Sequence, residues 1–316
     1  MPMLQQRVKE LIASQLEQWP TARKNFDDLN SVQVAEVKFG KYRMPVTFNP
    51  GRIRSTAAKV DSKTIAERRC FLCSENRPAE QEGIDFKRYT VLINPYPIFR
   101  HHLTIPDRSH TDQRMTAERA GDMLDLAAEL TEWSIFYNGP KCGASAPDHF
   151  HFQAGDRDYM PVEAEMKAAD KVLLKTDKLT IKTLDNYVRH IVILESACRQ
   201  TLVDAIMKVM EAVGETVARE PEPMVNLIAL RDGDMWRVAL FPRREHRPRQ
   251  FFAEDGQKIV FSPGAVDFGG VLILPRKEDF DRLAREPETI ADMFGQLTFS
   301  DEQFDELKHK IENLAL

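Results

Sequence analysis

The sequence predicts an α+β protein organised as two halves. Three observations predict this class. Short strand-like runs alternate with longer segments of helical periodicity, and the second half contains a hairpin pattern around Asp232-Gly233. In addition, "HHLTIPDRSH" and "WRVALFPRREH" both carry a strand into a proline and then a histidine, which hints at a duplication. We place the two halves at residues 1–180 and 181–316.

The first half begins with a helix and continues mainly as strands. Residues 3–18 have apolar side chains at helical spacing, and Pro20 predicts the end of that helix. A second helix with a long apolar face is expected at about 115–133. The expected strands are "VQVAEVKF" (32–39), "MPVTF" (44–48), "YTVLINPYPIF" (89–99), "HHLTIP" (101–106), "WSIFYNG" (133–139) and "DHFHFQA" (148–154).

The second half follows a charged connection. Residues 160–175 have a helical pattern, and the polar "KTDKLTIKTLDN" is expected to link the halves. The predicted order after it is a strand at "HIVILES", a helix at about 196–218, the hairpin "VNLIALRDGDMWRVALFP", a strand at "GGVLILP" and two helices near 277–295 and 300–315.

Composition narrows the classes of protein to consider. The 316 residues are 42% hydrophobic and 29% charged, which is enough apolar material for a large core. A net charge of −5 and a pI near 6.0 give no general attraction to nucleic acid or anionic membrane. No apolar run approaches the ~20 residues of a membrane span, and the opening segment is unlike a secretory signal, so we expect a cytoplasmic protein.

The segment "APDHFHFQAG" (146–155) is the strongest chemical signal. On a strand, His149, His151 and Gln153 share one face, while Phe150 and Phe152 point to the other. Burial of the two phenylalanines would anchor the strand by roughly 1.5–3 kcal/mol each. Histidines that contact solvent or satisfy core hydrogen bonds are the alternative. That alternative suits a bare H-x-H, whereas H-x-H-x-Q after "GAS" favours a chemical site.

Several motifs carry a resemblance to a known family. "YNGPKCGASAPDHFHFQAG" resembles the active-site segment of the histidine triad superfamily, in the branch of nucleotidyltransferases and phosphorylases. "VLINPYPIFRHHLTIPDRSH" is similar to the strand-loop-strand before that segment, and "CFLCSENRP" resembles the uridylyltransferase segment with a zinc-binding cysteine pair. "FSPGAVDFGGVLILPRKEDF" weakly resembles the hexose phosphorylases. The resemblance implies two histidine-triad-like halves, each with an antiparallel sheet and flanking helices, and it makes a homodimer plausible.

The resemblance also implies a role for each residue of the segment. His151 would attack an α-phosphorus and hold the nucleotidyl group covalently. Gln153 would hydrogen-bond the phosphoryl oxygens, and because an amide cannot shuttle protons near neutral pH, it favours transfer over hydrolysis. Ser145 and the amides around Gly143 would donate to phosphate oxygens, and Asn138 would position the loop. Ordinary turn formation is the alternative for these last three.

Cys70-x-x-Cys73 is a second constellation, within a chain of four cysteines that is too poor in cysteine for a disulfide scaffold. On its own the pair fits three alternatives: a metal-binding pair, a redox pair or two buried thiols. The resemblance supplies His110 and His149 as further ligands, which implies a structural zinc. The rival ligands, His101 and His102, could instead line the nucleotide pocket or lie on the surface.

Cationic and polar loops could hold the phosphates. Arg52, Arg54 and Lys59 lie in "NPGRIRSTAAK", and the cluster "FPRREHRPR" contributes Arg243 and Arg244. Asn94 is expected to shape the nucleotide pocket. Solvated loops and a plain proline-containing bend are the competing interpretations.

These residues lead to a functional hypothesis. We expect a nucleoside diphosphate sugar or a dinucleoside polyphosphate as donor, and phosphate or a sugar phosphate as acceptor. Asp148 stands where uridylyltransferases commonly have proline, and the second half lacks their additional His-x-His pair, so a phosphorylase fits better. A nucleotide hydrolase of the same fold and a non-catalytic nucleotide-binding protein are the alternatives.

Overall fold

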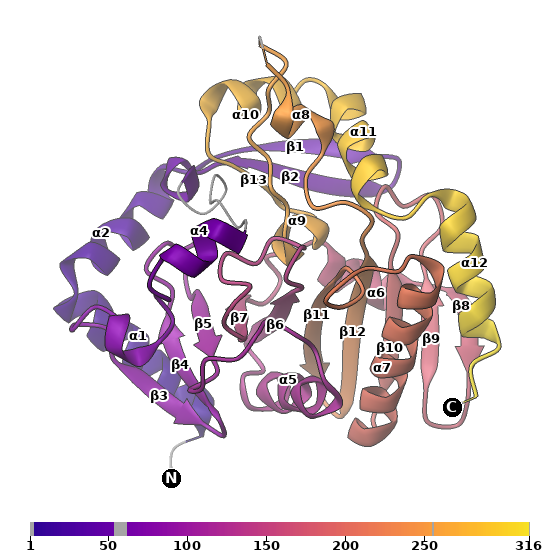
Figure 1. The fold of residues 1–316 in the computed structure, drawn as a ribbon, viewed down its shortest axis with the longest axis horizontal. Helices are drawn as coiled ribbons and strands as arrows, with labels where there is room; N and C mark the ends of the chain where they lie inside the picture. The colour runs from indigo at the N-terminus through magenta and orange to yellow at the C-terminus, as the bar shows by residue number, and fades with distance from the viewer. Residues whose placement is uncertain (1–2, 54–61, 255, 316) are drawn as a thin grey trace.

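One continuous ten-stranded sheet forms the centre of the protein. The computed structural model describes residues 3–53, 62–254 and 256–315 (Figure 1). The strand order is β3-β4-β5-β7-β6-β11-β12-β10-β9-β8, and every neighbouring pair is antiparallel. The strands are β3 (Gly83–Phe86), β4 (Tyr89–Ile93), β5 (Leu103–Pro106), β6 (Trp133–Asn138), β7 (His151–Asp156), β8 (Lys171–Lys175), β9 (Thr180–Thr183), β10 (Val192–Ser196), β11 (Val225–Asp232) and β12 (Met235–Pro242).

The sheet consists of two copies of the same topology. Each copy has three strands, a helix and two strands, with α5 (Ala117–Glu129) in the first and α7 (Arg199–Thr216) in the second. The spatial order is symmetric about the β6–β11 pair, so β5 corresponds to β10 and β7 to β12. The predicted two-half architecture is therefore confirmed. The second copy begins with β8 at Lys171, so the predicted boundary between residues 180 and 181 lies at the start of β9.

The two similar sequence segments that suggested a duplication do not belong to equivalent strands. "HHLTIPDRSH" contains β5 and "WRVALFPRREH" contains β12, and these two strands occupy non-equivalent places in the repeat. A strand followed by a proline and a histidine is too short a pattern to identify equivalent strands, whereas hydrogen-bonded order across the sheet identifies them directly.

A smaller sheet joins a segment of the first half to a segment of the second half. β1 (Gln33–Phe39) pairs with β2 (Tyr42–Phe48) in antiparallel fashion, and β13 (Leu272–Leu274) adds to β2 in parallel. Figure 1 shows this sheet above the upper end of the large one, with short helices around it. These helices are α8 (Arg249–Phe252), α9 (Ala265–Phe268), α10 (Lys277–Leu283) and α11 (Pro287–Leu297).

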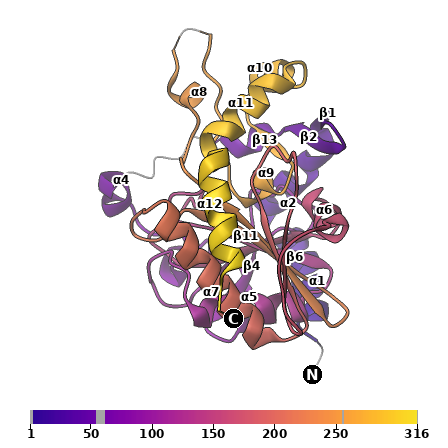
Figure 2. The same ribbon diagram turned by 90° about the vertical axis from the view of Figure 1, so that its right-hand side faces the viewer.

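The two faces of the large sheet pack into separate cores. Along β11, Leu227 belongs to one core and Ile228 to the other, as strand alternation requires. The first core lies under α5, α7, α1 (Leu4–Gln18), α2 (Pro20–Asp27) and α12 (Asp301–Glu312). Figure 2 shows α7 and α12 along this side. The second core lies under α6 (Val162–Ala168), α9 to α11 and the smaller sheet.

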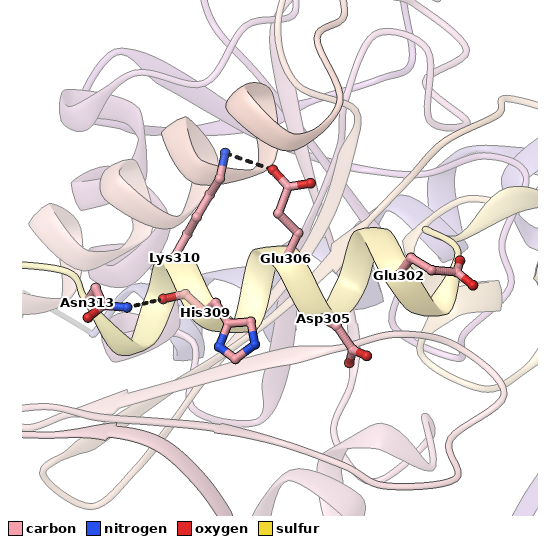
Figure 3. Close-up of a pocket in the computed structure, with 6 residues that line it drawn as sticks. All are labelled: Glu302, Asp305, Glu306, His309, Lys310 and Asn313. Carbon is pink, nitrogen blue, oxygen red and sulfur yellow. Dashed lines mark hydrogen bonds and ion pairs between the residues drawn. The ribbon is translucent and has the colours of Figure 1, made fainter.

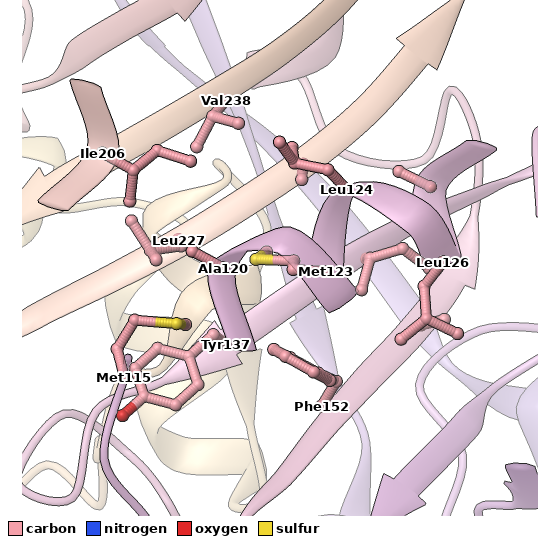
Figure 4. Packing of buried hydrophobic residues seen from close by; sticks show 14 of the residues in the cluster. Met115, Ala120, Met123, Leu124, Leu126, Tyr137, Phe152, Ile206, Leu227 and Val238 are labelled. Atoms are coloured by element: carbon pink, nitrogen blue, oxygen red, sulfur yellow. The ribbon is translucent and has the colours of Figure 1, made fainter. Parts of the chain in front are cut away.

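Helix α5 anchors the strand that carries the predicted chemistry. Figure 4 shows Met123 and Leu124 of α5 in one buried cluster with Tyr137 of β6, Phe152 of β7 and Leu227 of β11. All five side chains are at most 1% exposed. This close packing fixes the centre of the sheet and therefore the path of β7.

Some sequence predictions were wrong in detail. The helix predicted over 160–175 ends at Ala168 and is followed by β8, and the polar connection contains β9. Leu179 and Ile181 are buried there between the flanking Lys178 and Lys182, so pairing with β10 overrides the polar composition. The helix predicted at 277–295 is two helices, because Pro287 begins α11. None of the helices in the described part of the chain combines the length and the hydrophobicity of a membrane span.

Candidate active site

Strand β7 separates a packing face from a polar face. Phe150 and Phe152 are fully buried in the first core, so His151 and Gln153 point to the opposite face of the sheet. The regular strand begins at His151, three residues later than predicted. The chain is nevertheless held before that point, because the Phe150 N–H donates to the Thr111 carbonyl at 2.6 Å and the Phe150 carbonyl accepts from Asp107 at 2.9 Å.

The environment of His151 fixes both its orientation and its tautomer. Nδ1 lies 2.9 Å from the carbonyl oxygen of His149, which can only accept, so Nδ1 carries the proton. The Nε2 lone pair is then free of a hydrogen-bond partner among the described residues. The ring is 3% exposed, and burial lowers the pKa of His151 to about 4. Near neutral pH the side chain is therefore a neutral imidazole with its lone pair on Nε2.

Gln113 holds the start of this strand, a role that sequence reasoning missed. Its Oε1 accepts from the backbone N–H of His151 at 2.8 Å. Its Nε2 donates to the carbonyls of His151 at 3.0 Å and Asn138 at 2.9 Å. This buried amide therefore ties the start of β7 to the end of β6. A glutamine within "TDQRM" gives no sequence signal for such a contact.

Gln153 is hydrogen-bonded to His102 of the neighbouring segment. The His102 Nε2 lies 3.1 Å from Gln153 Oε1, and the His102 Nδ1 accepts from the backbone N–H of Ile98 at 3.1 Å. Burial, with a smaller effect from the nearby positive charge of Arg52, lowers the pKa of His102 to about 3. His102 is consequently a neutral, buried partner of the predicted phosphoryl-binding amide.

The loop after β6 is pressed against a segment of the second half. Asn138 Oδ1 accepts from Asn226 Nδ2 at 2.8 Å and from the backbone N–H of Ala265 at 2.7 Å. Gly143 has φ +91°, and a Cβ atom there would lie 2.7 Å from Gly264 Cα and 2.8 Å from the Pro263 carbonyl oxygen. The segment "FSPGAVDFGG" (261–270) therefore packs directly against the loop that carries Ser145. The Ser145 hydroxyl is half-buried and makes no hydrogen bond to the described part of the chain.

The four predicted metal ligands come together beside this strand. One ligand atom each from Cys70, Cys73, His110 and His149 lies within 4.8 Å of all the others. The His149 Nδ1 is 3.3 Å from Cys70 Sγ and 3.5 Å from Cys73 Sγ, and His110 Nδ1 is 3.2 Å from Cys73 Sγ. Bond lengths of about 2.3 Å to sulfur and 2.0 Å to nitrogen place such atoms roughly 3.5 Å apart around a tetrahedral zinc. The donor set therefore fits zinc.

The orientation of His149 supports the same interpretation. Its Nε2 lies 2.7 Å from the backbone carbonyl of Asp107, so Nε2 carries the proton and the Nδ1 lone pair faces the two sulfurs. A backbone carbonyl that fixes the tautomer in this way is usual behind a metal-binding histidine. His149 is fully buried, whereas His110 is exposed.

The rival histidines lie elsewhere, and Asp148 has its own partner. His101 Nδ1 contacts Asp156 Oδ1 at 2.5 Å, and His102 contacts Gln153, so neither belongs to the cysteine cluster. Asp148 forms an ion pair with Arg68, two residues before Cys70. This pair connects the strand to the segment that follows α4 (Ser62–Glu67).

The predicted cations that the structure describes, together with Asn94, are each held by hydrogen bonds within the chain. Arg52 donates to the Tyr96 carbonyl at 2.6 Å and lies near Asp267 and His102, where burial lowers the pKa of its guanidinium to about 10. Arg243 is fully buried and donates to Asn226 Oδ1 at 2.6 Å and to the carbonyls of Glu245 and His246. Arg244 Nη2 donates to the Gly295 carbonyl at 2.9 Å. Asn94 Oδ1 accepts from the Tyr96 N–H at 3.0 Å. Arg54 and Lys59 lie outside the described residues.

Two surface depressions of the described chain lie away from His151. One runs along α12, where Lys310 pairs with Glu306 and His309 is exposed to solvent (Figure 3). The other lies between α5 and α7 and is lined by Lys87, Arg88, Ala117, Glu118, Asp122, Arg199, Gln200 and Val203. None of the predicted site residues lines either depression.

Comparisons with known proteins cover both parts of the chain. Residues 11–156 match the family described as a domain of unknown function (DUF4922), and residues 161–316 match the family described as "GDPGP1-like, C-terminal domain". No curated protein sequence gives a match. Yeast Ap4A phosphorylase Apa2 in complex with Ap4A has a TM-score of 0.63 at 14% identity, covering 89% of this chain and 97% of that chain. The complex of the same enzyme with AMP has a TM-score of 0.60 at 15% identity, with coverages of 91% and 97%.

Proposed function

We propose that this chain, which has the fold of the nucleotidyltransferase and phosphorylase branch of the histidine triad superfamily, transfers a nucleotidyl group through His151. A single observation carries this proposal: the neutral His151 ring has its proton on Nδ1, held by the His149 carbonyl, and its lone pair on Nε2. A lone pair fixed on a rigid strand is the requirement for covalent catalysis by imidazole.

In the first step, Nε2 of His151 attacks the α-phosphorus of a nucleotide substrate. The phosphorus–nitrogen bond forms as the bond to the bridging oxygen breaks, and the leaving phosphate takes the bonding electrons. The ring gains positive charge, which the His149 carbonyl stabilises through the Nδ1–H hydrogen bond. Because His151 is only 3% exposed, neighbouring groups must move for the substrate to reach Nε2.

In the second step, an oxygen of the acceptor attacks the same phosphorus. The phosphorus–nitrogen bond breaks, its electrons return to Nε2, and the ring is again neutral. The amide of Gln153 and the hydroxyl of Ser145 are proposed donors to the phosphoryl oxygens in both steps. Since neither group takes up a proton near neutral pH, an acceptor that already carries negative charge, such as inorganic phosphate, suits this site better than water.

The substrate class follows from the same reasoning and from the fold. The yeast enzyme with this fold is an Ap4A phosphorylase whose crystal structures hold Ap4A and AMP. For this chain we propose a dinucleoside polyphosphate or a nucleoside diphosphate sugar as donor, with phosphate or a sugar phosphate as acceptor. Arg52 is the proposed phosphate ligand beside His102, whereas direct substrate contact by Asn94, Arg243 and Arg244 stays a prediction.

We also propose that Cys70, Cys73, His110 and His149 hold a zinc ion with a structural role. When bound, the metal would neutralise the two thiolates and fix His149, whose carbonyl in turn orients His151. No catalytic step depends on it.

The central test uses purified protein, a panel of nucleotide sugars and dinucleoside polyphosphates, and radiolabelled phosphate. We expect a labelled nucleoside diphosphate and, without acceptor, a covalently nucleotidylated protein. His151→Ala should reduce turnover by at least ~1,000-fold, as expected for loss of a covalent nucleophile. His309→Ala on exposed α12 is the matched histidine control.

Two outcomes separate the alternatives. Free nucleoside monophosphate formed at the same rate with and without phosphate would indicate a hydrolase. Equal nucleotide binding by wild-type protein and His151→Ala, with no turnover by either, would indicate a non-catalytic binding protein. Native mass spectrometry of the same sample would report the covalent nucleotide, the bound metal and the predicted homodimer together.

A further inference from the structure

We propose that His102 is a positioning residue, which orients the Gln153 side chain so that its NH2 group, and not its oxygen, faces the phosphoryl group. The inference rests on the proposed function, because it explains how one amide can serve as a donor to the nucleotide. It concerns a side chain that lies one strand away from the nucleophile and contacts neither metal nor metal ligand.

The hydrogen bonds of His102 leave a single tautomer for its ring. The backbone N–H of Ile98 can only donate, and it lies 3.1 Å from Nδ1, so Nδ1 carries the lone pair. The ring proton must then sit on Nε2, which lies 3.1 Å from Gln153 Oε1. A backbone donor thus determines, through one imidazole, which end of the Gln153 amide is engaged.

Packing prevents the ring from turning over. His102 is fully buried, with Phe99 edge-on at 5.2 Å and Phe136 at 6.2 Å between ring centroids. The backbone carbonyl of His102 accepts from the Asn94 N–H at 2.8 Å. Two residues later, Thr104 of β5 lies opposite Gln153 of β7 in the sheet. A flipped ring would place carbon atoms against both partners and leave a buried donor and a buried acceptor unsatisfied.

The orientation of Gln153 follows from this arrangement. With Oε1 held by His102, the two N–H bonds of Gln153 Nε2 remain without a partner among the described residues. Gln153 shares a strand face with His151, two residues away, so its side chain and the free donors lie on the same face of the sheet as the nucleophile. The reversed amide would present its oxygen to phosphoryl oxygens, which is a repulsive contact between two acceptors.

A pair of substitutions separates positioning from simple core packing. His102→Phe keeps an aromatic ring between Phe99 and Phe136 but can neither donate nor accept. His102→Gln can place an amide N–H near the position of the ring Nε2, and so it restores the hydrogen bond to Gln153. His101→Phe changes the neighbouring half-exposed histidine and serves as the matched control.

The readout is the rate of nucleotidylation of His151 at saturating substrate, together with KM and the melting temperature. Removal of one oriented transition-state donor typically costs about 100–1,000-fold. In His102→Phe the Gln153 amide is no longer held, but it still samples the correct orientation part of the time. We therefore expect a nucleotidylation rate about 10–100-fold below wild type, with little change in KM. His102→Gln should recover most of the rate, and His101→Phe should retain it. A His102→Phe rate equal to wild type, or no recovery in His102→Gln at an equal melting temperature, overturns the inference.

A spectroscopic measurement makes the inference independent of turnover. A long-range proton–nitrogen correlation spectrum of labelled wild-type protein reports the tautomer of each histidine. We expect His102 as the neutral Nε2–H form, and an Nδ1–H form or a doubly protonated ring overturns the inference. If wild-type protein is labelled by no nucleotide of the panel, the proposed function fails, and this spectrum alone decides whether His102 donates to Gln153.

Discussion

The contact between the two halves at Gly143 gives a sharply testable prediction. Gly143→Ala would place a methyl group 2.7 Å from Gly264 Cα and 2.8 Å from the Pro263 carbonyl oxygen. Both are backbone atoms, so neither can turn aside, and the loop must move away from the second half. The positive φ adds a second cost, because L-residues pay about 1–2 kcal/mol in left-handed conformations.

A matched glycine isolates the effect of the clash. Gly40 also has a positive φ, of +57°, but nothing lies within 4 Å of the position its Cβ would take. Gly40→Ala should therefore cost only the conformational 1–2 kcal/mol, whereas overpacking in Gly143→Ala adds about 1–3 kcal/mol. With an unfolding entropy of about 2.1 cal/mol/K per residue, 1 kcal/mol shifts the melting temperature of a chain this long by roughly 1.5 °C.

Thermal unfolding and His151 nucleotidylation are the two assays for this pair. We expect a melting temperature about 3–7 °C below wild type for Gly143→Ala and about 1.5–3 °C below it for Gly40→Ala. Only Gly143→Ala should also slow nucleotidylation, since its loop carries Ser145 and leads into His151. Equal melting temperatures and equal labelling rates for the two variants would refute the packing of this loop against residues 263 and 264.

Three further predictions concern the metal, a buried carboxyl group and the core. Elemental analysis should find about one zinc per chain. Cys73→Ser should lose the zinc and Cys198→Ser should keep it, and an equal metal content in the two variants would contradict the proposed zinc site. Burial raises the pKa of Glu222 from 4.5 to about 7, so the folded chain binds an extra proton between these values. Stability relative to Glu222→Gln should fall by about 3 kcal/mol as pH rises through this window, and a flat difference in denaturant titrations would contradict it. Phe152→Ala should cost about 3–5 kcal/mol in the same titrations, and a loss below about 1 kcal/mol would show that β7 is not anchored as described.

Local patterns in the sequence were sufficient for much of the fold. The period-two alternation around His151 predicted a strand with a packing face and a polar face, because strand side chains must alternate whatever the tertiary context. The pattern around Asp232-Gly233 predicted the β11–β12 hairpin, which has Gly233 at φ +57°. The cysteine pair and two distant histidines were identified as one ligand set only through a family resemblance, yet the chain does bring them together.

Other elements could not be predicted because their stability comes from distant partners. β9 looks polar in sequence and exists because β10 pairs with it, and β13 joins the smaller sheet beside β2, more than 200 residues earlier in the chain. The predicted boundary between the halves at residues 180 and 181 stays a prediction.

The sequence alone determined which residue types could perform the chemistry, since His151, Gln153 and the cysteine pair carry their reactivity in their side chains. Only the tertiary structure decided how those groups are oriented. Gln113 fixes the start of β7, Asn138 is tied to the second half, and Ile98 sets the tautomer of His102 and through it the amide of Gln153. Each of these is a hydrogen bond between segments that fold together only in three dimensions. Proton positions and amide orientations depend on such partners and on no property of the residue itself.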